Sequence, residues 1–261
     1  MRRRLHRLLV LVPLVATAVV TPLVVQPAGG QSDEDDLLAT GAELYETGCS
    51  SCHGPTGQGV EGDDGNVRGP SLENSGEAAA YYYLSTGRMP LGNSEEQPVR
   101  KRPEYDEEEQ AALVAFVGSL GDGPETPDVD IEGADLAAGG EIFRANCQAC
   151  HSASGSGGAL SYGRAAPRLQ PATPTEIAAA VRVGPGQMPV FGPETISDEE
   201  LNDVVRYVEY LDAPADPGGV PIGRTGPIPE GFVAWLIGMV ALLALVAWIG
   251  TRSPIRRSRH P

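Results

Sequence analysis

The sequence predicts a mainly α-helical protein in which two similar domains stand in tandem before one membrane-spanning helix. Two observations predict this. The segment Gly41–Cys49 recurs as Gly139–Cys147, and Asp106–Leu120 recurs as Ser197–Leu211, so each unit has the length of a small domain. The eighteen residues Phe232–Ile249 carry no charge and precede a cluster of arginines, which is typical of a membrane span.

Apolar side chains recur at helical spacing near the end of each unit. Ser197 with Glu200 forms a capping box before the pattern of the second unit, and Thr173 with Glu176 offers another at the start of an earlier helix. No alternating run of β-branched residues bounded by turns is present, so no strand is predicted. The periodic positions are Leu113, Phe116, Val117 and Leu120 in the first unit, and Leu201, Val204, Val205 and Val208 in the second.

Long glycine-rich loops, Gly54–Gly69 and Ser152–Gly163, interrupt the helices. Such loops are unusual in a compact domain. They suggest that something other than side chains fills part of each core.

The amino-terminal segment is basic over Met1–Arg7 and largely apolar over Leu8–Val25. A cleaved signal peptide and a retained anchor both fit this pattern. Ala28 and Gly30 would be the small residues of a cleavage site before Gln31. Both interpretations stay open.

The carboxyl-terminal apolar run is expected to cross a membrane. Trp235 and Trp248 lie near its two ends, and the arginines of Arg252–Pro261 follow it. A buried core helix is the alternative, but an uncharged run followed by a basic cluster favours a span. The positive-inside rule then places the basic tail in the cytoplasm of a plasma-membrane protein, and the two domains on the extracytoplasmic side.

These features divide the chain as follows. Residues 1–30 are a signal peptide or anchor, 31–122 the first domain, 123–130 a linker, 131–212 the second domain, 213–230 a tether, 231–250 the membrane helix and 251–261 a basic tail.

The charge distribution argues against nucleic-acid binding. The net charge is −16, and the 35 acidic residues all lie between the two basic ends, whereas a duplex-binding surface needs clustered cations. The acidic runs Asp33–Asp36 and Asp106–Glu109 are predicted to begin helices. Acidic patches could also dock a redox partner, but none is singled out.

The motif Cys-x-x-Cys-His occurs once in each unit and predicts covalent haem attachment. Each pair of thiols would form two thioethers, and the adjacent histidine would ligate the iron. A redox dithiol, a disulfide or a zinc site shared by the two pairs are the alternatives. The residues are Cys49, Cys52 and His53 for haem 1, and Cys147, Cys150 and His151 for haem 2.

The second axial ligand follows by elimination. After its haem motif each unit has one methionine and no further histidine, and both methionines stand in Gly-x-Met-Pro. An isolated methionine is more often a core residue, but the matched positions favour ligation by Met89 and Met188. Histidine–methionine ligation raises the haem potential, which suits electron transfer.

Each unit resembles a class I cytochrome c domain. The Gly-x-x-x-aromatic element before the haem motif is Gly41 with Tyr45, and Gly139 with Phe143; the carboxyl-terminal helix carries Phe116 or Tyr207. The resemblance implies that the two terminal helices of each domain cross closely at the small residue. It also implies that the carbonyl groups of Pro70 and Pro167 accept hydrogen bonds from the proximal histidines.

The whole chain resembles the family of dihaem cytochrome c subunits of the actinobacterial cytochrome bc complex. This resemblance implies a subunit of quinol–cytochrome c reductase that carries electrons and has no catalytic residue of its own. Its implied partners are the cytochrome b and Rieske iron–sulfur subunits and an aa-type cytochrome c oxidase held in a supercomplex. The electron-carrying subunit of another membrane dehydrogenase or reductase, and a haem sensor, are the alternatives.

Two features have no assigned role. The first unit contains an extra polar loop around Ser94–Arg102 that the second lacks. It also contains Tyr81-Tyr82-Tyr83, which predicts two core positions and one at a haem edge or an interface.

Overall fold

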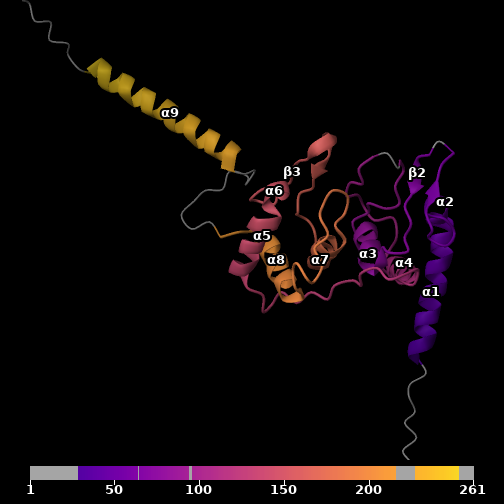
Figure 1. Cartoon of the computed structure of the whole chain (residues 1–261). Coiled ribbons are helices and arrows are strands. Elements are labelled where there is room, and N and C mark those ends of the chain that lie inside the picture. Colours follow the sequence, from indigo (N-terminus) through magenta and orange to yellow (C-terminus); the bar gives the residue numbers. More distant parts are fainter. Residues whose placement is uncertain (1–28, 64, 94–95, 216–226, 253–261) are drawn as a thin grey trace, which may run out of the picture.

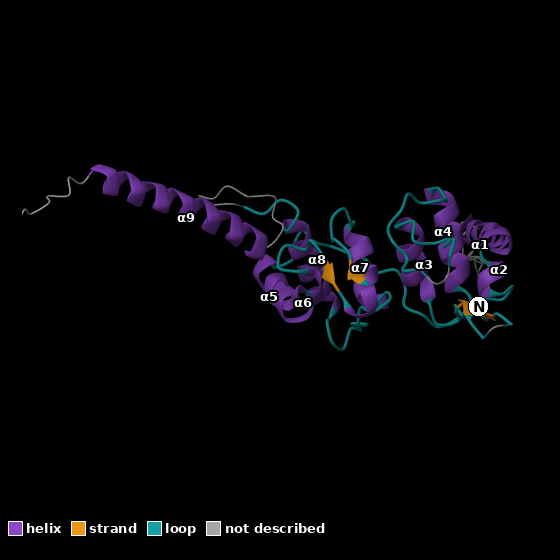
Figure 2. Ribbon diagram, turned by 90° about the horizontal axis from the view of Figure 1, so that it is seen from above, coloured by secondary structure: helices purple, strands orange, loops and turns teal. Residues whose placement is uncertain are grey.

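A computed structural model describes residues 29–63, 65–93, 96–215 and 227–252 (Figure 1). Two helical domains lie next to each other, and one long helix projects from the second (Figure 2). The expected mainly α fold is confirmed.

The first domain, within the described residues, contains helices and one antiparallel hairpin. Strand pairing joins Val60 to Gly69 and Glu61 to Val67. The elements are α1 (Gly29–Gly48), α2 (Ser50–His53), β1 (Val60–Glu61), β2 (Val67–Gly69), α3 (Gly76–Ser85) and α4 (Glu107–Gly118).

The second domain repeats this order. Its hairpin pairs Gly158 with Ala166 and Ala159 with Ala165. The elements are α5 (Leu136–Asn146), α6 (Gln148–His151), β3 (Gly158–Ala159), the 3₁₀ turn η1 (Ser161–Gly163), β4 (Ala165–Ala166), α7 (Pro174–Val183) and α8 (Asp198–Tyr210).

The expectation that strands would be absent is wrong for these two hairpins. Each strand is only two or three residues long, and a strand that short cannot show the alternation of apolar and polar residues that predicts strands. The hairpins form inside the glycine-rich loops, through backbone pairing that owes little to side-chain pattern.

The first and last helices of each domain cross at a glycine. A Cβ atom on Gly41 would overlap the carbonyl oxygen of Ala112 in α4, and one on Gly139 would overlap the carbonyl oxygen of Asp203 in α8. Beside the first crossing, the rings of Tyr45 and Phe116 lie 5.0 Å apart. The close crossing leaves no room for a larger side chain.

The helix starts follow the capping pattern. The capping boxes at Thr173 and Ser197 are confirmed, and Asp106 forms a third one at the start of α4. The first acidic run does not begin a helix, because α1 starts at Gly29, ahead of Asp33.

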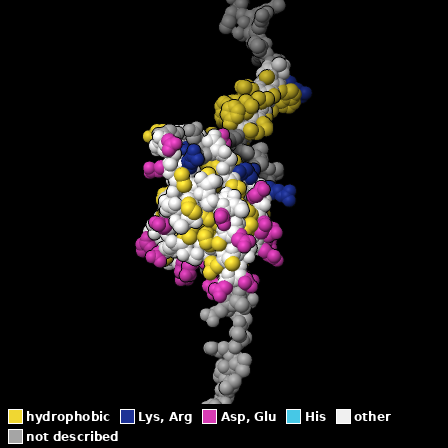
Figure 3. Space-filling view, turned by 90° about the vertical axis from the view of Figure 1, so that its right-hand side faces the viewer, with side chains coloured by type: hydrophobic (Ala, Val, Ile, Leu, Met, Phe, Trp, Pro, Cys, Tyr) yellow, Lys and Arg dark blue, Asp and Glu magenta, His cyan; other side chains and the backbone are white. Residues whose placement is uncertain are grey.

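The last helix, α9 (Pro227–Arg252), stands apart from both domains. Its residues Glu230–Arg252 are long and apolar enough to cross a membrane, and its side chains are largely exposed, as the apolar surface in Figure 3 shows. The helix begins at Pro227, inside the segment expected to be tether, because Pro is favourable in the first helical turn. The expected amino-terminal signal or anchor (to residue 28), most of the tether (216–226) and the basic tail (from 253) lie outside the described residues.

Candidate functional site

Each Cys-x-x-Cys-His motif forms a short helix directly after the first helix of its domain. The backbone N–H of His53 donates to the carbonyl oxygen of Cys49 at 2.9 Å, and that of His151 donates to the carbonyl oxygen of Cys147 at 2.9 Å. One helical turn therefore places both thiols and the imidazole of each motif close together.

The two cysteines of a motif differ in burial. Cys49 and Cys147 pack against their domain cores, whereas Cys52 and Cys150 are exposed. Burial, with a smaller contribution from the neighbouring cysteine, raises the pKa of the Cys49 thiol and of the Cys147 thiol to about 11.

All four cysteines are free in the structure, and no group of three or more His, Cys, Asp or Glu side chains among the described residues forms a metal site. The described residues therefore show neither a disulfide nor a preformed group of zinc ligands.

Each proximal histidine contacts a proline carbonyl oxygen. Nδ1 of His53 lies 2.8 Å from the oxygen of Pro70, and Nδ1 of His151 lies 3.1 Å from the oxygen of Pro167. A carbonyl oxygen only accepts, so Nδ1 carries the proton in both rings. This tautomer leaves the Nε2 lone pair free to ligate a metal.

The second histidine is the more buried of the two. His151 is 9% exposed, and burial lowers its pKa, against a smaller opposing effect of the hydrogen bond to Pro167. The ring is therefore neutral at physiological pH, as iron ligation requires.

Each methionine packs against the same core cluster as the half-buried cysteine of its own domain. Met89 and Cys49 pack against one core cluster, and Met188 and Cys147 pack against the other. The backbone N–H of Met89 donates to the carbonyl oxygen of Tyr83 at 3.0 Å, which fixes the start of the methionine loop on α3. In each domain, the predicted methionine ligand and the first cysteine of the motif thus pack against the same core cluster.

Sequence reasoning missed two contacts that shape the site. A Cβ atom on Gly69 would lie 2.5 Å from the carbonyl oxygen of Cys52, and one on Gly158 would lie 2.8 Å from that of Cys150, so each hairpin folds tightly against its motif. In the first domain, the buried hydroxyl of Tyr45 donates to the carbonyl oxygen of Gly54 at 2.8 Å. The glycines of these loops are the sequence feature from which the hairpins could have been predicted.

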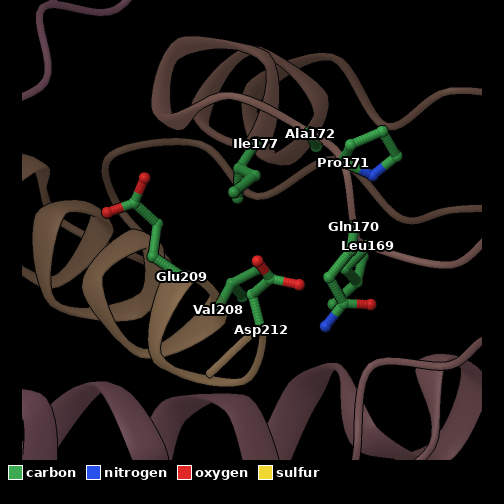
Figure 4. A pocket seen from close by; sticks show the side chains of 8 residues that line it. All are labelled: Leu169, Gln170, Pro171, Ala172, Ile177, Val208, Glu209 and Asp212. Carbon is green, nitrogen blue, oxygen red and sulfur yellow. The ribbon is translucent and has the colours of Figure 1, made fainter. Parts of the chain in front are cut away.

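A cavity of ≈ 300 Å³ opens in the second domain beside α7 and α8 (Figure 4). Apolar side chains of these two helices form part of its wall, and two carboxylates near the end of α8 lie at its edge. None of the predicted haem ligands lines it. The lining residues are Leu169, Gln170, Pro171, Ala172, Ile177, Val208, Glu209 and Asp212.

Two known families match this chain, one over each of the two duplicated domains. The family described as "Cytochrome c" matches residues 38–121, and the family described as "Cytochrome C oxidase, cbb3-type, subunit III" matches residues 134–208. Both haem motifs fall inside these matches.

Curated relatives match almost the whole chain. The "Cytochrome bc1 complex cytochrome c subunit" of Mycobacterium bovis is 42% identical, over 97% of this chain and 94% of the relative. The chain belongs to the family of cytochrome bc1 complex cytochrome c subunits. The member from Mycobacterium leprae is 42% identical over 94% of this chain and 87% of its own, and that from Corynebacterium efficiens is 38% identical over 92% and 84%.

The residues present fit haem c, the cofactor that cytochrome c domains indicate. Each domain offers two thiols within one helical turn, an imidazole with its Nε2 free and a thioether in the same core cluster. These donors match the requirements of haem attachment and histidine–methionine ligation.

Proposed function

We propose that this chain is a membrane-anchored dihaem cytochrome that carries electrons from a Rieske iron–sulfur subunit towards a terminal cytochrome c oxidase. The observation that carries the proposal is the pair of equivalent sites, each with a proline-bound histidine, in a chain 42% identical to a subunit named for the cytochrome bc1 complex.

The proposed roles of the site residues are the same in both domains. Haem c, when bound, supplies an iron that alternates between the ferrous and ferric states. Cys49 and Cys52 would hold haem 1 covalently, and His53 and Met89 would be its axial ligands. For haem 2 the corresponding residues are Cys147, Cys150, His151 and Met188.

The protein would tune each site through its own contacts. The carbonyl groups of Pro70 and Pro167 orient the imidazole rings and raise their basicity. With both a histidine and a methionine holding its iron, the bound haem would supply electron transfer rather than chemistry on O₂ or peroxide. The chain therefore acts as the electron carrier of an oxidoreductase, with no catalytic residue of its own.

The proposed arrangement in the membrane follows from the charges at the chain ends. The first haem domain spans 31–122 and the second 131–212, joined by the linker 123–130. Both would lie outside the plasma membrane, with the residues after α9 in the cytoplasm. The arginines that follow the apolar helix support this orientation.

Partner subunits provide the test. A chain tagged after Pro261 and recovered from mild-detergent membranes should bring down a cytochrome b, a Rieske subunit and subunits of an aa-type oxidase. A tagged protein with an unrelated single membrane helix is the control. Recovery of a dehydrogenase or of a nitrogen-oxide reductase, without cytochrome b, would support the alternative electron-carrying role and contradict this one.

A further inference from the structure

The two domains contact each other through equivalent helices, α3 and α7 (Figure 2). Ala78 and Tyr82 of α3 pack with Ala179 of α7 in one buried cluster, and both neighbours of Tyr82, Tyr81 and Tyr83, pack against it. At the positions aligned with the three tyrosines, the second domain has Ala180, Val181 and Arg182. The tyrosine run of α3 thus lies against the small residues of α7, which is a complementary fit.

A loop that only the first domain contains adds further bonds between the two domains. Sixteen residues separate Met89 from Asp106, whereas eight separate Met188 from Ser197. The extra length includes the 96–102 loop, whose end is fixed to its own domain by a hydrogen bond from the N–H of Lys101 to the carbonyl oxygen of Thr86 at 3.1 Å.

From this loop an arginine reaches the second domain. Nη1 and Nη2 of Arg100 lie 3.3 and 2.5 Å from the two carboxylate oxygens of Glu176. The Glu176 side chain is 5% exposed and also caps α7 by accepting from the N–H of Thr173. A bidentate pair to a buried carboxylate is directional, so it fixes the loop at one position on α7.

A glutamine of the same loop makes a second bridge. Nε2 of Gln97 donates to the carbonyl oxygen of Ala165 at 2.8 Å, and the N–H of Ala165 donates to Oε1 of Gln97 at 3.1 Å. Ala165 lies in β4, in the hairpin that folds against the second haem motif. The loop therefore holds both α7 and the second hairpin.

The linker between the domains is also packed at both ends. The N–H of Ala78 in α3 donates to the carbonyl oxygen of Pro124 at 3.0 Å. At the other end, Val129 and Ile131 pack against the second core, and the N–H of Asp130 lies 3.3 Å from Oδ1 of Asn202. The linker thus adds contacts to both domains.

We propose that the 96–102 loop and the α3–α7 contact fix the two haem domains as one unit, with Arg100 as the positioning residue. Resting on the proposed function, this unit would let an electron leave the ferrous iron of one haem and reduce the ferric iron of the other without domain movement. Because electron tunnelling falls steeply with distance, a fixed separation keeps this transfer fast.

The experiment measures the separation directly. Spin labels on Ser119→Cys and Glu141→Cys, both exposed, report the distance between domains in the full chain, with both haems reduced and therefore diamagnetic. Arg100→Glu places a negative charge against Glu176. Arg102→Glu makes the same charge change two residues away, on an exposed side chain, and is the matched control.

The parent chain and Arg102→Glu should show one narrow distance distribution. Arg100→Glu should broaden it towards longer distances and slow electron exchange between the haems about tenfold, because a repulsion against the Glu176 side chain, which is 5% exposed, weakens the docking of the domains by at least this factor. Adding Glu176→Gln, which retains the helix cap, should relieve the repulsion and narrow the distribution again.

A broad distribution in the parent, or equal behaviour of Arg100→Glu and Arg102→Glu, would overturn the proposal. If Arg100→Glu loses a haem, the Gln97→Ala variant provides the test instead. A broader distance distribution in Gln97→Ala, with both haems present, would support the proposal. An unchanged distance distribution would contradict it. The distance measurement needs no partner subunit. A result that contradicts the fixed domain arrangement is therefore distinguishable from a result that contradicts the proposed function.

Discussion

Nδ1 of His53 donates a hydrogen bond to the carbonyl oxygen of Pro70, and this contact joins residues seventeen positions apart. It fixes the histidine tautomer from the far side of a glycine-rich loop, because the loop returns through the β1–β2 hairpin to bring Pro70 against the ring. The same relationship between His151 and Pro167 in the second domain shows that the duplicated sequence produces duplicated chemistry.

Replacing one attaching cysteine should remove one haem. In Cys52→Ala or Cys150→Ala the covalently bound haem of the denatured chain should fall to half, measured by the haem absorbance per chain. Ser51→Ala, beside the first of these cysteines, is the control and should retain both haems. Full retention in both cysteine variants would contradict covalent attachment at these motifs.

Changing an axial methionine should lower the potential of one haem. Met89→His or Met188→His should keep six-coordinate iron, because imidazole is also a strong ligand. The potential of that haem should fall by roughly a hundred millivolts or more, within the ~0.8 V range that axial ligands span. A redox titration of each variant measures this, with Met239→Leu in α9 as control; unchanged potentials at both sites would mean that neither methionine ligates iron.

The helix crossing in the second domain should not tolerate a methyl group. Gly139→Ala would press a Cβ atom on the carbonyl oxygen of Asp203, and overpacking of this kind costs about 1–3 kcal/mol of unfolding free energy. Alanine's better helix propensity would offset about 1 kcal/mol of that cost. Thermal unfolding should show a lower midpoint for this variant.

Gly133→Ala is the control for that crossing, since no atom lies within 4 Å of a Cβ atom there. Its unfolding free energy should stay within about 0.5 kcal/mol of the parent. Equal midpoints for the two variants would show that α5 and α8 do not cross as closely as described.

The hydroxyl of Tyr45 should stabilise the first domain. Tyr45→Phe removes the donor to the buried carbonyl oxygen of Gly54, which should cost about 1–3 kcal/mol. Tyr162→Phe is a matched control, since Tyr162 is 95% exposed. Chemical unfolding followed at the Soret band measures both, and an equal effect of the two changes would rule out a structural role for the hydrogen bond.

Protease treatment should reveal the orientation in the membrane. In right-side-out vesicles, added protease should cut between the second domain and α9 and release a soluble fragment with two haems. A tag after Pro261 should stay protected until detergent is added, which is the control for protease activity. Digestion of the tag in intact vesicles, or protection of the haem domains, would reverse the proposed topology.

Local patterns in the sequence were sufficient to predict the later helices of each domain and the chemical groups expected at the site. Helix caps such as Ser197 with Glu200 act within one turn, so a short segment predicts them. The Cys-x-x-Cys-His motif is equally local, and its repetition with one methionine in each unit predicts the donor set. The apolar run of α9 follows from composition and length alone.

Only the tertiary structure decided how distant segments meet. The hairpins depend on backbone pairing across glycine-rich loops, and Tyr45 reaches Gly54 only because α1 and the chain after α2 lie side by side. The contact between Arg100 and Glu176 joins two domains, and no periodicity within either domain encodes it. The sequence by itself determined the helices, the haem motifs and the membrane helix, because these depend on neighbouring residues; the domain contact was decided by three-dimensional packing between residues far apart in the chain.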